Sequence, residues 1–202
     1  MKARMPTQDR KREIVQVALL IAFKVGPAQL TTGMIAAELG LSQPAIYKHY
    51  PSKNDLMAEI SQYLSQCITE NIATTSHIKD APVERLKQLV LEHLKLLKEY
   101  PALPEFMILR DKNEGHINMH DTIQDTMIAF NVALEAEVKA AIAQDQFRES
   151  LNAMDATILI FGVIQSLVLR MLVSRNSSVL TTDGARLLNL QLAGFMKTGE
   201  DG

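Results

Sequence analysis

The chain has 202 residues, 47% of them hydrophobic and 5% aromatic, so aliphatic side chains and ten Met must fill a core that has no Trp. This length suits one large or two small domains, and the scarcity of strand formers favours an all-helical protein. The single cysteine, Cys67, excludes an internal disulfide framework and is compatible with a reducing cytoplasm.

Charge is unevenly distributed along the chain, although the formal net charge is only −2. Residues 1–55 contain eight Lys and Arg against four Asp and Glu, a net +4, whereas the remaining residues contain 13 against 19, a net −6. A basic segment joined to an acidic body is typical of a polyanion-binding module attached to a second function. The basic N-terminal residues are not followed by the apolar run of a signal peptide, so we expect a cytoplasmic protein.

Two helices are predicted at the N-terminal end of the chain. Apolar residues repeat at the 3.6-residue helical period after Pro6, and Gly26 with the proline that follows it ends this first helix. Thr31 or Thr32 caps a short second helix, and Gly40 ends it.

A third and a fourth helix follow at once. Ser42 is placed as the N-cap of the third helix, with Pro44 in its first turn, where a missing N–H costs nothing. Pro51 stops that helix, and Ser52 caps the fourth. A short helix, a glycine turn and a second short helix rich in polar side chains predict a helix–turn–helix that binds DNA.

The rest of the chain is predicted to be helical too. Apolar periodicity predicts five further helices, at about residues 82–100, 104–110, 119–143, 155–174 and 184–197. We therefore expect about nine helices in an all-α fold. Residues 1–55 would form a three-helix helix–turn–helix domain, with a linker helix from residue 53, and residues 56–202 a helical effector-binding and dimerisation domain.

The helix at 155–174 is unusually apolar. Between Asp155 and Arg170 only three of fourteen residues are polar, so it must be covered on two sides. A membrane span is not expected, because fourteen residues are fewer than the ~20 needed to cross a bilayer. The last helix is also rich in Leu, so we expect these two helices to pack against a second copy as a four-helix bundle. The alternative is a monomer with this helix fully buried at its centre.

The third helix carries the side chains expected to read DNA bases in the major groove. The amide of Gln43 can bond adenine through two hydrogen bonds, and the methyl of Ala45 can touch a thymine methyl. Pro44 offers an apolar surface without a donor.

Six side chains around this helix are expected to bind the DNA backbone: Thr31, Thr32, Tyr47, Lys48, His49 and Lys53. Lys53 lies at a helix start, where backbone N–H groups already favour a phosphate. The alternative is a surface helical hairpin that binds no DNA.

The segment LTTGMIAAELGLSQPAIYKHYPSKNDL resembles the N-terminal domain of the TetR family of bacterial repressors. The matching features are a Thr before the second helix, I-A-x-x-L-G-L-S across the turn, Y-x-H-Y at the end of the recognition helix and S-K-x-x-L at the start of the next. The resemblance implies an all-helical homodimer that dimerises through its last two helices. It also implies repression of transcription until a small effector binds the C-terminal domain.

The resemblance also implies site residues. Family members touch DNA at the positions of Thr32, Ser42, Gln43, Ala45, Tyr47, Lys48, His49 and Lys53. Gly33 stands where some relatives have an Arg or another long base-contacting side chain. Base reading is therefore expected from Gln43 and Ala45 rather than from the second helix.

An effector pocket is expected among the helices between Val83 and Leu172. Candidate wall residues are Leu94, Phe106, Met107, Arg110, Met127, Phe130, Phe161 and Gln165. An apolar wall with few polar groups is the usual composition of a ligand site. Arg110 suggests an anionic effector unless it forms a surface ion pair. The alternative for the apolar residues is that they belong to the hydrophobic core and line no pocket.

No cofactor or metal is expected. His116 and His120 are four residues apart, a spacing that can hold a metal, but a solvated helix start is favoured. Cys67 is expected to be buried and not redox-active. His93, on an apolar stripe, is expected to be a core histidine with satisfied hydrogen bonds.

The leading hypothesis is a dimeric transcriptional repressor that binds a palindromic double-stranded operator and is released by an unknown small molecule. A DNA-binding protein without ligand control fits the long apolar helices equally well. An enzyme is not expected, because the sequence shows no nucleophile–base pair, metal cluster or Gly-rich phosphate loop. The effector, the operator and the direction of regulation stay open.

Overall fold

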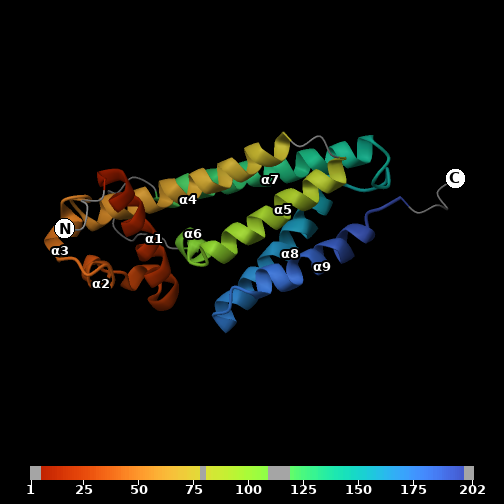
Figure 1. Ribbon diagram of the computed structural model, residues 1–202. Helices are drawn as coiled ribbons and strands as arrows, with labels where there is room; N and C mark the ends of the chain where they lie inside the picture. The colour runs from red at the N-terminus through yellow and green to blue at the C-terminus, as the bar shows by residue number, and fades with distance from the viewer. Residues whose placement is uncertain (1–5, 78–80, 109–118, 198–202) are drawn as a thin grey trace. The chain divides into compact units, whose positions relative to one another are not determined.

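The computed structural model describes residues 6–77, 81–108 and 119–197 (Figure 1). These ranges contain nine α-helices, one short 3-10 helix and no strand beyond a single antiparallel bridge between Phe147 and Met196. In chain order the elements are α1 (Thr7–Val25), η1 (Pro27–Gln29), α2 (Thr32–Glu38), α3 (Gln43–Tyr47), α4 (Lys53–Ser76), α5 (Pro82–Glu99), α6 (Leu103–Ile108), α7 (Met119–Ala143), α8 (Ala153–Ser174) and α9 (Val179–Ala193). The expected all-α fold is confirmed.

The chain divides into two compact units. The first comprises Met1–Ser65 and Tyr100–Gln124, and the second comprises Gln66–Glu99 and Asp125–Gly202. Helices α4 and α7 therefore contribute residues to both units. The expected boundary between functional domains at residue 56 follows a different criterion and stays a prediction.

The first unit joins α1, α2 and α3 through small buried faces. Ile14 and Ala22 of α1 are fully buried, and α2 packs against both α1 and α3. Gly40 turns the chain between α2 and α3 at φ +62°, a conformation that glycine adopts without steric cost. The Leu41 N–H closes this turn by donating to the carbonyl of Ala36 at 2.8 Å. The expected order of helix, glycine turn and helix is present.

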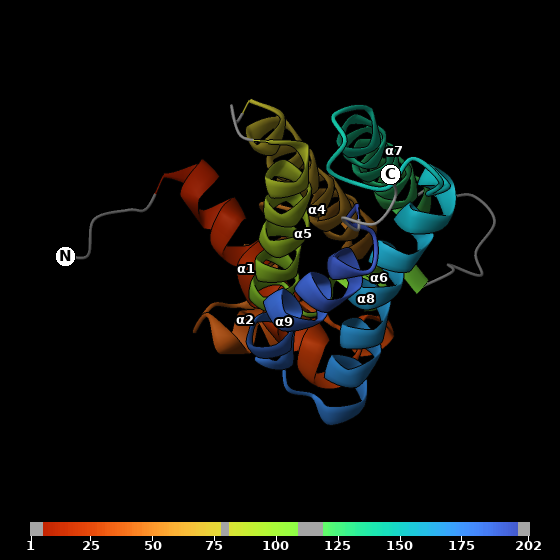
Figure 2. The ribbon, with the colours of Figure 1, turned by 90° about the vertical axis from the view of Figure 1, so that its right-hand side faces the viewer.

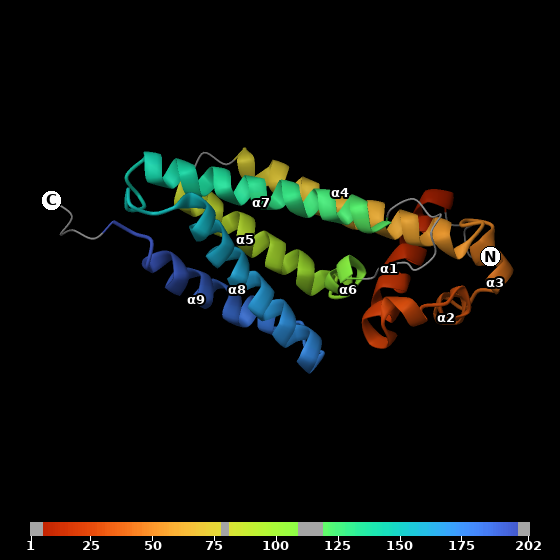
Figure 3. The same cartoon turned by 180° about the vertical axis from the view of Figure 1, so that it is seen from behind.

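The second unit is organised around α5 and the helix pair α8–α9. Figures 2 and 3 show α8 and α9 side by side, and α9 also packs on α5. At this contact a Cβ on Gly184 would stand 2.5 Å from Cδ1 of Leu94. Gly184 is thus a packing residue inside α9. The expected helix at 184–197 is wrong in its bounds, since α9 runs from Val179 to Ala193.

Helix α8 exposes large apolar side chains. Met154, Ile158, Leu159, Leu169 and Val173 are each between 50% and 79% exposed, so the alternative of a fully buried central helix is wrong. With 22 residues and a mean hydropathy of 2.1, α8 has the length and composition of a membrane span, and 33% of its apolar window is buried. The length argument against a span therefore does not hold for the helix as it forms.

His93 is a buried histidine of α5, only 2% exposed. Its ring stacks on Phe130 of α7 with 4.2 Å between the centroids. The expected core position of His93 is therefore confirmed. The expected satisfied hydrogen bonds are wrong, because its buried Nδ1 has no hydrogen-bond partner among the described residues. Burial lowers the pKa of His93 from 6.5 to about 4, because the imidazolium would lose its hydration.

This neutral histidine predicts a pH dependence of stability. Between pH 6.5 and about 4 the unfolded chain binds a proton at His93 that the folded chain does not. The free energy of unfolding should therefore fall as the pH is lowered through this window, by up to about 3 kcal/mol from this residue. Urea unfolding of the protein and of His93→Phe at neutral and mildly acidic pH measures the effect. Equal losses in both proteins would contradict it.

Candidate DNA-binding site

Helix α3 is held in place by its neighbours. Five residues are too few for a stable isolated helix, because fixing the backbone of the first turn costs more conformational entropy than its one hydrogen bond offsets. Ile46 is fully buried and Tyr50 is 2% exposed. The Tyr50 hydroxyl donates to the carbonyl of Lys11 in α1 at 3.2 Å, and Lys11 Nζ stands 5.2 Å from the ring centroid. Burial raises the pKa of Tyr50 above its usual range, so the hydroxyl keeps the proton that this bond needs.

Hydroxyl side chains define the helix starts around the site. Thr31 accepts a hydrogen bond from the N–H of Met34 at 3.2 Å and caps α2. Ser52 accepts from the N–H of Asp55 at 3.1 Å and donates to its carboxylate at 2.7 Å. These two caps are confirmed. Ser42 occupies the N-cap position of α3, but its exposed hydroxyl makes no capping bond within the described residues.

A chain of three polar side chains joins α2 to α3. Nε2 of Gln43 donates to Oγ1 of Thr32 at 2.8 Å, and this hydroxyl donates to the hydroxyl of Tyr47 at 3.2 Å. Thr32 is only 4% exposed, so it lies inside the site, whereas the sequence placed it against the DNA backbone. The structure therefore gives Thr32 a bridging position that its spacing in the sequence did not reveal.

The other expected contacts lie at or near the surface of these helices. Side chains open to solvent are those of Thr31, Gln43, Pro44, Tyr47, Lys48 and Lys53. Ala45 is half-buried, which leaves part of its methyl accessible. Lys53 is the first residue of α4, where the free N–H groups of the helix start add to its charge. The site therefore presents hydrogen-bond donors and two lysine cations together with the apolar side chains of Pro44 and Ala45.

His49 and Gly33 stand apart from this set. His49 is half-buried, and its Nδ1 is shielded without a hydrogen-bond partner among the described residues, so a phosphate would have to bind at Nε2. The nearest atom that a Cβ on Gly33 would meet is Oγ1 of Thr31 at 3.8 Å, an ordinary contact. Packing therefore leaves room for a longer side chain at position 33.

The candidate effector residues are divided between the two units. In the first unit Phe106 is buried and Met107 half-buried. In the second unit Leu94, Met127 and Phe130 are buried, Phe161 is half-buried and Gln165 is exposed on α8. Arg110 lies outside the described residues. Gln165 is thus exposed, unlike Leu94, Met127 and Phe130 of the same unit, with which it was grouped.

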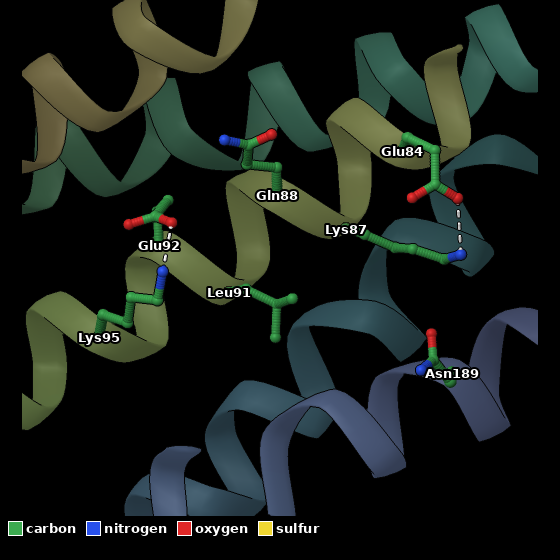
Figure 4. A pocket seen from close by; sticks show the side chains of 7 residues that line it. All are labelled: Glu84, Lys87, Gln88, Leu91, Glu92, Lys95 and Asn189. Carbon is green, nitrogen blue, oxygen red and sulfur yellow. Dashed lines mark hydrogen bonds and ion pairs between the residues drawn. The ribbon is translucent and has the colours of Figure 1, made fainter. Parts of the chain in front are cut away.

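A hollow of about 440 Å³ lies on the surface of the second unit between α5 and α9 (Figure 4). It is lined by Glu84, Lys87, Gln88, Leu91, Glu92, Lys95 and Asn189. Lys87 pairs with Glu84 at 2.8 Å, and Lys95 pairs with Glu92 at 2.6 Å. With one apolar residue in its wall, this hollow differs from the mostly apolar lining of a small-molecule site.

The structure does not test the candidate metal pair. His116 lies outside the described residues, and the side chain of His120 is not described either. Among the described side chains, no group of three or more His, Cys, Asp and Glu is arranged to hold a metal ion. Cys67 is half-buried rather than buried as expected.

A short recognition helix, held by packing and by hydrogen bonds to its neighbours within an all-α chain, is typical of a helix–turn–helix transcription regulator. Residues 14–60 match the family described as bacterial regulatory proteins, tetR family, and residues 60–190 match the YsiA-like protein, C-terminal region. The chain belongs to the TetR family of transcriptional regulators.

Known proteins resemble this chain over most of its length. The nucleoid occlusion factor SlmA of Escherichia coli O1:K1 / APEC is 26% identical over 156 residues, which cover 75% of this chain and 76% of SlmA. A TetR transcription regulator from Haloarcula marismortui ATCC 43049 has a TM-score of 0.73 and 24% identity, with 94% and 100% of the two chains covered. FadR from Bacillus subtilis, in complex with stearoyl-CoA, has a TM-score of 0.67 and 20% identity, with 91% and 98% covered. At these identities the two solved structures show a shared fold.

The exposed lysines predict the salt dependence of DNA binding. Lys48→Ala and Lys53→Ala should each weaken binding about equally for all DNA sequences and reduce the slope of log affinity against log salt by ~0.9. Fluorescence anisotropy at several salt concentrations measures both effects. Lys95→Ala, which removes a lysine paired with Glu92 on α5, is the matched control and should leave the slope unchanged. A slope that is unaltered by both substitutions at the site would exclude these lysines as phosphate contacts.

Proposed function

We propose that this protein is a transcriptional repressor that binds a two-fold operator as a homodimer and releases it when a small molecule binds its helical body. The observation that carries the proposal is the polar surface of α3, where Gln43 and Tyr47 are both exposed and both tied to Thr32. A glutamine amide held at the N-terminal end of such a helix can read adenine in the major groove. The family and fold are those of regulators, so we propose no enzymatic activity, and the cytoplasm is the proposed location.

The exposed apolar surface of α8 supports a dimer. Five large apolar side chains of this helix, with Leu190 of α9 at 70% exposure, form more apolar surface than one protomer covers. Large exposed apolar surfaces mark interaction sites in soluble proteins. A second copy would supply the same two helices and bury them as a four-helix bundle with two-fold symmetry.

Ligand control is supported by the similarity in fold to FadR, whose structure was solved in complex with stearoyl-CoA. The second candidate function is DNA binding without ligand control, and the similarity to SlmA, a nucleoid occlusion factor, favours it. Stearoyl-CoA is the first probe to separate the two. Release of a bound operator by stearoyl-CoA supports ligand control, whereas release by none of a panel of acyl and aromatic compounds supports the alternative.

Selection of bound fragments from genomic DNA tests the proposed function. We expect one enriched sequence with two inverted half-sites, whose centres are about one helical turn or more apart. Binding in proportion to fragment length, without an enriched sequence, would contradict a specific regulator. An enriched sequence without symmetry would contradict the dimer alone.

The dimer can be tested by a charge on α8. Leu169→Glu should shift sedimentation from dimer to monomer, because a carboxylate buried in the interface would lose its hydration. Leu20→Glu in α1 is the matched control, since Leu20 is exposed to a similar degree, 56% against 63%. The control should stay dimeric. Dimers of equal stability for both variants would contradict an interface on α8. Leu188 is unsuitable for this test because it is fully buried within the protomer.

A further inference from the structure

The hydrogen bonds from Gln43 to Thr32 and from Thr32 to Tyr47 form a chain with a direction. Gln43 donates to the hydroxyl of Thr32 at 2.8 Å, and Thr32 donates its single proton to the hydroxyl of Tyr47 at 3.2 Å. The proton of Tyr47 is then left over, and its side chain is 41% exposed. A phosphate oxygen, which can only accept, would accept a hydrogen bond from this free O–H.

We propose that Thr32 is a specificity-determining positioning residue that lets the phosphate bound by Tyr47 fix the orientation of the Gln43 amide. This inference rests on the proposed function, because it requires α3 to lie in the major groove. Once Tyr47 donates to a phosphate, its oxygen can only accept from Thr32. Thr32 has no second proton, so it must accept from Gln43, and only the NH₂ end of the amide can donate.

The orientation of this amide decides which base it reads. With one N–H bonded to Thr32, Gln43 keeps its second N–H and Oε1 for a base edge. This donor and acceptor match N7 and N6–H of adenine. Rotating the amide by 180° exchanges its nitrogen and oxygen and reverses the pattern. A contact to the DNA backbone carries no sequence information by itself. Through Thr32, however, this contact determines which base the Gln43 amide can read.

Burial makes Thr32 suited to this role. At 4% exposure its hydroxyl is held by the packing of α2, whereas the two groups it joins are on the surface. The bond orders the glutamine before DNA binds and so reduces the side-chain entropy lost on binding.

The experiment compares base preferences of full-length variants by selection from a duplex library randomised across one half-site. Thr32→Val keeps the shape of the side chain and removes the hydroxyl. We expect it to lower the preference for the best base, at the base position that Gln43 contacts, by about three- to tenfold. This loss is a part of the discrimination that one bidentate contact supplies. Tyr47→Phe should broaden the same position, because Thr32 can then donate to Oε1 and both amide orientations become satisfied. Thr32→Ser should restore the wild-type preference.

Lys48→Ala is the matched control, since Lys48 is an exposed neighbour on α3 outside the chain of hydrogen bonds. It should weaken binding and leave the preference profile unchanged. Unchanged profiles for both Thr32→Val and Tyr47→Phe would overturn the proposal, and so would a Thr32→Ser profile as broad as that of Thr32→Val. If Thr32→Val fails to fold, the exposed Tyr47→Phe decides alone. A wild-type protein that enriches no sequence would instead overturn the proposed function.

Discussion

The DNA-binding end of this protein depends on a helix that cannot form alone. Helix α3 has five residues, and an isolated helix of that length is unstable in water. Buried Ile46 and Tyr50, the bond from Tyr50 to Lys11 and the bridge through Thr32 supply what the helix lacks. The exposed side chains of α3 are free to be polar because these residues, and not the exposed ones, determine where the helix lies.

In the second unit, too, one set of residues packs within the protomer and another set is exposed. Gly184 lets α9 approach Leu94 of α5 closely, and the buried residues of α8 and α9 pack into the protomer. The large apolar side chains on the other surface of α8 are left exposed. In the dimer proposed above, these exposed side chains would be covered by the second copy, and two recognition helices would meet two half-sites.

Local signals predicted most of the fold. Prolines, glycines and capping hydroxyls marked the starts of α2 to α4 and the ends of α1 to α3, and the apolar period located α5 and α7. The errors have a common cause. Gly184 was expected to begin a helix, but it lies inside α9, where it packs against Leu94 of α5. His93 was expected to have satisfied hydrogen bonds, and the bridge from Thr32 to Gln43 and Tyr47 was not foreseen, because spacing along one helix does not report what a neighbouring helix brings to it.

Base reading by α3 can be tested by replacing each purine of the selected operator in turn with its 7-deaza analogue. The substitution removes a major-groove acceptor and leaves base pairing intact. If α3 of each protomer reads adenine through Gln43, affinity should fall at one purine in each half-site, at symmetric positions, and Gln43→Ala should abolish that sensitivity. Affinity that is insensitive to every such replacement, or equally sensitive with Gln43→Ala, would contradict base reading by this helix.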